Sequence, residues 1–280
     1  MAKTRRLIKE SLPLIDAVAE ILDARIPLSS RNPEILQLTN RKPRIILLNK
    51  CDMAAEHATR KWIEYYKKQG ITALPVDCKT GKGLDRFLSA VKELLRDKLK
   101  AYQAKGVKNK KLRIMVLGIP NSGKSSFINR MNKNKGAKVE NRPGVTRSNQ
   151  WYTIDKTVEM LDTPGVLWPK FEDPAVGQRL AFTGAVRDSI LDIETLALEL
   201  LELLSAQYKT ELCGRYALPE DAAGTPDQWL KAIGRKRGNL IPGGEVDTER
   251  TAVMLLEEFR GGKIGRITLE SPLSCGTSPL

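Results

Sequence analysis

The chain has 280 residues, is 41% hydrophobic and carries a formal net charge of +14. Its length supports a real core divided over two domains, and we expect no membrane span because no apolar run approaches the roughly eighteen residues that cross a bilayer. Its single histidine, His57, argues against His-rich metal sites and Ser/His pairs. Four scattered cysteines without CxxC spacing predict reduced thiols and a cytoplasmic location.

The excess of positive charge predicts a polyanionic partner, with nucleic acid ranked ahead of an acidic membrane surface. A protein that is merely basic and soluble is the alternative. Few aromatic residues accompany the basic ones, which favours structured phosphate backbone over stacked bases. Between positions 98 and 113 there are seven basic residues and no acidic one: Lys98, Lys100, Lys105, Lys108, Lys110, Lys111 and Arg113.

In the first part of the chain, strands alternate with helices. A basic amphipathic helix is expected over residues 4–14, a strand over 17–23 and a loop over 24–33, before a short buried strand at 44–48. The next expected elements are a helix at 57–69, a strand at 72–76, a helix at 84–103, a strand at 113–117, a helix at 124–131 and two hairpin-linked strands at 150–154 and 158–161.

Beyond Pro174 the strand pattern ends, and helices are expected at 190–205, 227–233 and 248–260. Alternating strands and helices imply an α/β fold, with a mostly parallel sheet covered by helices on both faces. We therefore predict an α/β domain over residues 1–173 and a small α-helical C-terminal domain over residues 174–280.

A phosphate-binding loop of the form GxxxxGKS is predicted at residues 118–125, between a strand and a helix. Its backbone N–H groups would cradle phosphate oxygens at the start of the helix. Lys124 would place its charge on the β- and γ-phosphates, and Ser125 would give an oxygen to Mg²⁺. The predicted nucleotide-binding residues of this loop are Pro120, Asn121, Ser122, Gly123, Lys124, Ser125 and Ser126.

The segment Asp162-Thr163-Pro164-Gly165 closes a strand, where a P-loop enzyme places the carboxylate that orients Mg²⁺. Gly165 would turn its N–H toward a γ-phosphate, and Thr146 is the candidate for a second hydroxyl ligand of Mg²⁺. An ordinary strand-end turn is the alternative for residues 162–165. Lys124, Thr146 and Gly165 are the predicted catalytic residues.

Guanine recognition is predicted from Asn49-Lys50-Cys51-Asp52, an NKxD motif. The Asp52 carboxylate would accept hydrogen bonds from guanine N1 and N2, which adenine cannot donate in that pattern. Asn49 would hold the base edge and brace the loop, and the stem of Lys50 would cover the ring. A degenerate match to the Ser-Ala-Lys loop at residues 76–81, with Cys78 and Lys79, would touch guanine O6 through a backbone N–H. A redox role for Cys78 is the alternative to a plain thiol.

The order of these motifs is unusual. NKxD lies about seventy residues ahead of the phosphate-binding loop, whereas an ordinary GTPase has the two motifs in the opposite order. Circular permutation explains this order, because the termini of a domain often lie close together at its surface. The α/β domain is thus expected to be a circularly permuted P-loop GTPase domain. Only about a dozen residues separate Asp162 from the helical domain, so a shift at Gly165 could reorient that domain.

The assembled sequence resembles the YlqF/RbgA family of circularly permuted, bacterial ribosome-biogenesis GTPases. The resemblance covers nearly the whole chain: Asp23-Ala24-Arg25-Ile26-Pro27 with Ser29-Ser30-Arg31-Asn32-Pro33, the permuted motif order, the segment from Asp162 to Lys170, and Gly261-Gly262-Lys263-Ile264-Gly265-Arg266. It implies a GTP-dependent role in late assembly of the large (50S) ribosomal subunit, with binding to rRNA in the GTP state and release after hydrolysis. GTP or GDP and Mg²⁺ are the implied ligands, and we expect no DNA or membrane partner.

Catalysis is expected to be slow without the ribosome. Val166 stands where Ras-like enzymes carry the glutamine that orients water. Similar GTPases use an asparagine at the position of Asn121 to hold K⁺, although a plain loop residue is the alternative. Family members carry a Phe-Pro-Gly-His-Met segment whose histidine is implicated in hydrolysis. The sequence begins at the corresponding methionine, so we expect either an upstream start or another catalytic group, and His57 is expected on the surface.

Two other functions remain open from the sequence. One is a GTP-dependent RNA-binding scaffold with little intrinsic catalysis, which Val166 favours. The other is a permuted GTPase that acts on the small ribosomal subunit.

Overall fold

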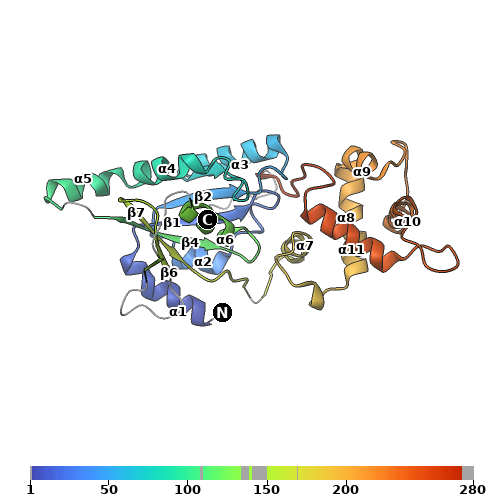
Figure 1. Ribbon diagram of the computed structural model, residues 1–280, viewed down its shortest axis with the longest axis horizontal. Coiled ribbons are helices and arrows are strands. Elements are labelled where there is room, and N and C mark those ends of the chain that lie inside the picture. Colours follow the sequence, from blue (N-terminus) through green and yellow to red (C-terminus); the bar gives the residue numbers. More distant parts are fainter. Residues whose placement is uncertain (1, 108–109, 134–138, 141–149, 169, 273–280) are drawn as a thin grey trace. The chain divides into compact units, whose positions relative to one another are not determined.

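The computed structural model describes residues 2–107, 110–133, 139–140, 150–168 and 170–272 (Figure 1). Contacts within the chain form two compact units, one of Met1–Phe171 with Thr268–Leu280, the other of Glu172–Ile267. The segment after Ile267 thus lies with the first unit, whereas the sequence assigns it to the C-terminal domain. Glu270 explains this difference, because its carboxylate binds backbone N–H groups of the first unit.

The first unit is built on one sheet whose strand order, over the described residues, is β3-β2-β1-β4-β7-β6-β5. β3 through β7 in this order are parallel, β6 is antiparallel to β7, and β5 is antiparallel to β6. The mostly parallel sheet and the terminal hairpin are confirmed, whereas β5 was not predicted. The strands are β1 (Ala17–Asp23), β2 (Arg44–Asn49), β3 (Thr72–Pro75), β4 (Leu112–Gly118), β5 (Val139–Glu140), β6 (Gln150–Thr153) and β7 (Val158–Asp162).

The central strand β1 is buried along its whole length, as a strand covered on both faces of a parallel sheet should be. Alternate side chains enter different cores. Ala19 and Ile21 pack in the cluster that contains Phe87 and Phe127, whose rings meet edge to face at 5.1 Å. On the other face, Leu22 packs in the cluster that contains Trp62 and Tyr66, and Val18 in the cluster with Ile8.

These cores come from helices on both faces of the sheet. Phe87 belongs to α4 (Phe87–Leu94) and Phe127 to α6 (Lys124–Lys133). Trp62 belongs to α3 (Glu56–Lys68), and Ile8 to α1 (Ala2–Ser11). The predicted layers are therefore present.

Two helices of the first unit differ from the prediction. The expected helix at 84–103 is divided, because Leu95 leaves helical geometry (φ −109°, ψ 20°) between α4 and α5 (Arg96–Ala104). A short helix, α2 (Pro33–Leu38), follows the loop at 24–32 and was not predicted. Its start has a clear cause, since the Asn32 side chain accepts hydrogen bonds from the Glu34 and Ile35 N–H groups and Pro33 occupies the first turn.

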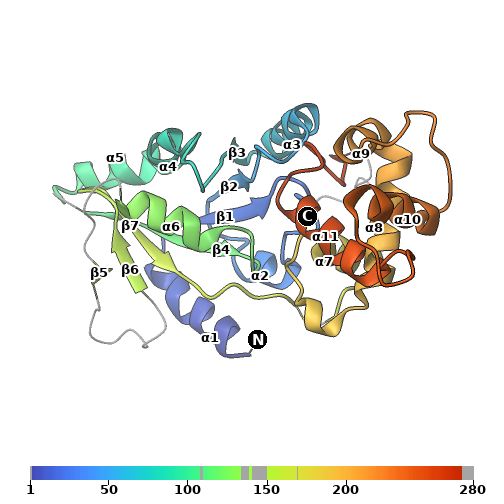
Figure 2. The same ribbon diagram turned by 45° about the vertical axis from the view of Figure 1, so that its right-hand side comes forward.

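The second unit is helical, and its α8 packs along α10 and α11 (Figure 2). The predicted helix at 190–205 begins three residues later than expected, at Ile193, and side chains cap both α8 and α10. Asp192 caps α8, and Thr225 forms a reciprocal capping box with Gln228 at α10. α7 and α9 were not predicted. The helices are α7 (Pro174–Phe182), α8 (Ile193–Gln207), α9 (Lys209–Tyr216), α10 (Pro226–Arg237) and α11 (Thr248–Arg260).

None of the helices in the described part of the chain is both long and apolar enough to cross a membrane.

Candidate functional site

Three predicted site segments meet the end of β1 at the carboxyl edge of the sheet, because parallel strands end side by side. In the strand register, Asp23 lies opposite Asn49, Ile21 opposite Gly118, and Val116 opposite Asp162. The ends of β1, β2, β4 and β7 therefore come together. Ligands of open α/β sheets bind outside such strand ends.

The phosphate-binding loop is a tight turn between β4 and α6. Ser122 closes it, since its N–H and its hydroxyl both donate to the Ile119 carbonyl, at 3.3 and 2.9 Å. Asn121 and Gly123 have positive φ angles of 58° and 96°. The turn delivers the N-terminus of α6 to the loop, where backbone N–H groups and the helix dipole favour an anion. Ser125 and Ser126 are exposed there.

Asn49 joins three of the predicted motifs. Its side-chain amide donates to the Ser122 carbonyl of the phosphate-binding loop at 2.7 Å, and its carbonyl oxygen accepts from the Cys78 N–H at 2.9 Å. Only 3% of Asn49 is exposed, so both hydrogen bonds form in a dry environment. The side chain that ends β2 thus ties the guanine motif to the phosphate loop and to the loop at 76–81.

Gly123 makes this arrangement sterically feasible. A Cβ atom at Gly123 would lie 2.0 Å from the Asn49 amide nitrogen, far closer than two non-bonded heavy atoms can approach. The positive φ of Gly123 adds a second reason for glycine at this position.

Lys124 forms an ion pair with the Asp162 carboxylate at the end of β7. Two residues predicted to act on the phosphates and on Mg²⁺ are therefore in contact. Beyond Asp162, the Thr163 hydroxyl donates to the Val116 carbonyl at 2.6 Å. Gly165 lies against the phosphate-binding loop, since a Cβ there would be 3.2 Å from the Pro120 nitrogen. Its predicted role toward a γ-phosphate stays a prediction, and Thr146 lies outside the described residues.

Asp52 is exposed, as a residue that reads a base must be, while the neighbouring Lys50 is held by an interaction that the sequence did not reveal. Lys50 has a positive φ of 59°, and its ammonium group donates to Asp23 Oδ2 at 2.9 Å. Asp23 also binds the buried Arg25 guanidinium through both carboxylate oxygens, at 3.0 and 2.8 Å.

Asp23 remains ionised although it is buried. Burial alone would raise the pKa of the Asp23 carboxyl, but attraction to Arg25 and Lys50 holds that pKa far below its ordinary value. Sequence reasoning missed Asp23 and Arg25 as site residues. One available signal was the position of Asp23, at the end of a strand beside the strand that delivers Asn49.

The loop at 76–81 is shaped by Asp77, whose carboxylate accepts from the Lys79 N–H at 2.8 Å, the Thr80 N–H at 3.2 Å and the Thr80 hydroxyl. Burial would raise the pKa of Asp77, and these hydrogen bonds lower it overall. The Cys78 N–H donates to Asn49, so a guanine O6 at this loop would have to share that donor. The contact with O6 through Cys78 stays a prediction.

Cys78 is buried, and burial raises the pKa of its thiol to about 12, with the Asp77 charge adding to the effect. We therefore expect iodoacetamide at pH 8 to label Cys78 at least ~100-fold more slowly than the partly exposed Cys51, because the thiolate is the reactive form. Peptide mass spectrometry over a time course measures both rates. Equal rates would contradict the plain structural thiol and restore the redox alternative.

The loop after Gly165 contacts the first part of the chain. The Val166 carbonyl accepts a hydrogen bond at 3.0 Å from Asn32, the residue that caps α2. The Val166 side chain packs beside the cluster that contains Ile8 and Ile35. An apolar, partly buried side chain at this position cannot orient water. His57 is exposed on α3, as predicted.

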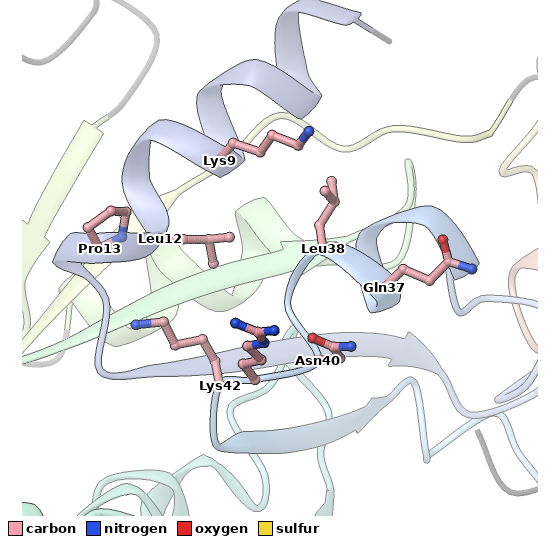
Figure 3. A pocket seen from close by; sticks show the side chains of 8 residues that line it. Lys9, Leu12, Pro13, Gln37, Leu38, Asn40 and Lys42 are labelled. Atoms are coloured by element: carbon pink, nitrogen blue, oxygen red, sulfur yellow. The ribbon is translucent and has the colours of Figure 1, made fainter.

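A depression of about 590 Å³ lies between the ends of α1 and α2 (Figure 3). It is a separate feature, since none of its lining residues belongs to the motifs described above. Its lining residues are Lys9, Leu12, Pro13, Gln37, Leu38, Asn40, Arg41 and Lys42.

Comparisons with known proteins agree with this geometry. The family model described as "50S ribosome-binding GTPase" matches residues 113–211. The ribosome biogenesis GTPase A of Priestia megaterium is 49% identical over 276 residues, covering 97% of this chain and 94% of that protein. The enzyme of the same name from Bacillus cereus is 45% identical, covering 99% of this chain and 93% of that protein.

Solved structures show the same fold. The crystal structure of GNP-bound YlqF from T. maritima is similar with a TM-score of 0.69 and 26% identity, over 96% of this chain and 98% of that chain. A GDP-bound YlqF structure has the same TM-score and identity, over 95% of this chain and 99% of that chain. With a permuted set of guanine-nucleotide motifs on this fold, and near half identity along its whole length, the chain belongs to the ribosome biogenesis GTPase A family.

Proposed function

We propose that this protein binds GTP, associates with the immature large ribosomal subunit in that state, and leaves after hydrolysis. The observation that carries the proposal is the similarity to ribosome biogenesis GTPase A, at 49% identity over 97% of the chain. The site supports the nucleotide part of it, because Asn49 brings the guanine motif and the phosphate-binding loop into contact.

The residues present suit a nucleotide with Mg²⁺. The Ser125 hydroxyl and the Asp162 carboxylate are the hard oxygen donors that Mg²⁺ prefers, and Mg²⁺, when bound, neutralises charge on the β- and γ-phosphates. Lys124 would exchange its Asp162 partner for phosphate oxygens, which frees that carboxylate to face the ion. Thr146 is proposed as a second hydroxyl donor. The N–H groups of residues 118–124 would hold the phosphates, and the Gly165 N–H would face the γ-phosphate.

The charge distribution supports rRNA as the partner, but fewer cations of the predicted basic run are available to bind its phosphates. Within the basic run, Lys98 pairs with Asp16 at 2.5 Å, and both Lys111 and Arg113 pair with Glu159. These three cations are thus partly neutralised inside the first unit. Exposed cations remain on α5 at Lys100, just after α5 at Lys105, and at the end of α10 at Arg235 and Lys236.

Turnover of GTP measured alone, with purified large subunits and with small subunits tests the proposal. We expect stimulation by large subunits and none by small subunits. Lys124→Ala is the matched background, since it keeps the fold while removing the cation from the phosphates. If GTP binds but large subunits give no turnover above the Lys124→Ala background, the RNA-binding scaffold replaces the GTPase. Stimulation by small subunits alone would support the small-subunit alternative.

Potassium is proposed as the ion that supplies transition-state charge, with Asn121 as its candidate ligand. Asn121 is exposed on the phosphate-binding loop and has a left-handed backbone conformation, with φ of 58°. We expect subunit-stimulated turnover at least ~10-fold faster in K⁺ than in Na⁺, since removing one charge-stabilising group costs that much or more. Equal rates in the two salts would contradict the potassium role and leave Asn121 as a plain loop residue.

A further inference from the structure

The chain leaves the second unit at Ile267 and returns to the first unit through residues 268–270, which we call the strap. All three strap residues are buried, with 5–7% of each exposed. The strap lies more than two hundred residues along the chain from the guanine motif, and no predicted function uses it.

Glu270 binds the loop at 24–32 by its carboxylate. Oε2 accepts from the Leu28 N–H at 2.7 Å, and Oε1 accepts from the Ser29 N–H at 3.0 Å and from the Ser29 hydroxyl. Three donors on one buried carboxylate form a set of charge-assisted hydrogen bonds, which are stronger than neutral ones.

The rest of the strap adds further contacts. The Leu269 N–H donates to the Arg25 carbonyl at 2.8 Å. The Thr268 hydroxyl accepts from the Ala55 N–H at 3.0 Å, and the Trp62 indole donates to the Glu270 carbonyl at 3.2 Å. The strap therefore joins the loop at 24–32 to the start of α3, the helix that follows the guanine motif.

Arg25 connects the loop at 24–32 to the guanine motif at residues 49–52. Burial would lower the pKa of its guanidinium, but attraction to Asp23, and then to Asp52, raises that pKa above its ordinary value. The Arg25 guanidinium binds Asp23, and Asp23 in turn binds the Lys50 ammonium group of the guanine motif. The loop at 24–32 thus positions the Lys50 side of the guanine motif, and Thr268 positions Ala55 on its other side.

We propose that Glu270 is a positioning residue for guanine recognition: it fixes the strap against the loop at 24–32, so that Asp23 holds Lys50 and Thr268 holds the backbone just after Asp52 in place for the base. The inference rests on the proposed binding of guanine nucleotides.

The test compares the dissociation constants of GDP and IDP for the parent chain, Glu270→Gln and Glu220→Gln. IDP lacks the 2-amino group that Asp52 would bind, so the IDP/GDP ratio reports the placement of Asp52. A glutamine at 270 has one acceptor oxygen for three donors, whereas Glu220 is exposed in the second unit. We expect Glu270→Gln to weaken GDP about tenfold and IDP much less, as the loss of a charge-assisted hydrogen bond predicts, with Glu220→Gln unchanged. Ser29→Ala, which removes one donor, should act in the same direction with a smaller effect.

Unchanged constants in both Glu270→Gln and Ser29→Ala would overturn the inference while the proposed function stands. An equal loss for GDP and IDP would also overturn it, because a merely structural role lowers both affinities together. If the parent chain itself binds neither GDP nor GTP, the proposed function fails and the inference fails with it. If Glu270→Gln does not fold, the Ser29→Ala ratio decides between these outcomes.

Discussion

Gly123→Ala is expected to weaken GDP and GTP binding by ~100-fold or more, close to 3 kcal/mol. The new methyl group would meet the Asn49 amide at 2.0 Å, in a residue whose φ of 96° already disfavours a side chain. Asn49 would have to leave the Ser122 carbonyl, so the phosphate-binding loop and the guanine motif would separate. Equilibrium binding of a fluorescent GDP measures the effect.

Gly70→Ala is the matched control for this variant. Gly70 has a similar positive φ of 73°, but a Cβ there meets nothing within 4 Å. Both variants carry the cost of left-handed backbone, about 1–2 kcal/mol of folding free energy. Only Gly123→Ala should lose nucleotide affinity, and equal affinities in the two variants would contradict the steric argument.

Asp52→Asn is expected to weaken GDP binding by about 10³-fold and to improve binding of xanthosine diphosphate. An asparagine presents an amide donor where the carboxylate accepts, which opposes the guanine N–H groups and complements the 2-oxo group of xanthine. A site built on hydrogen bonds discriminates strongly when one partner is mismatched. Competition between the two diphosphates measures the switch.

The control for Asp52→Asn is Asp221→Asn, the same chemical change at an exposed position of the second unit. It should leave both affinities unchanged. If Asp52→Asn retains the parent preference for GDP over xanthosine diphosphate, then Asp52 does not read the base and the assignment of the guanine motif is wrong.

The parts of the fold that sequence reasoning predicted are those with long local signals. β1 and β2 are mostly apolar and are buried along their whole length, which is the pattern of parallel strands covered on both faces. α8 and α11 were predicted because each carries apolar residues at helical spacing over more than ten residues. The short helix α2 was missed despite its Asn32-Pro33 start, since six residues give too little periodicity.

The candidate site divides in the same way. The phosphate-binding loop and the guanine motif are contiguous sequences, so their residue types alone indicate their chemistry. Asp23, Arg25 and Glu270 act through the tertiary structure: Glu270 binds Ser29 across a separation of 241 residues. No local pattern predicts such a contact, and the pairing of Lys124 with Asp162 was likewise visible only in three dimensions.

The measurement that tests the central claim most directly is co-sedimentation of the chain with immature large subunits and with small subunits, in a GTP analogue and in GDP. We expect the chain to pellet with large subunits in the presence of the analogue and to remain in the supernatant in the presence of GDP. It should not pellet with small subunits in either nucleotide. Equal binding to large subunits with either nucleotide, or binding to small subunits instead, would contradict a GTP-dependent role in large-subunit assembly.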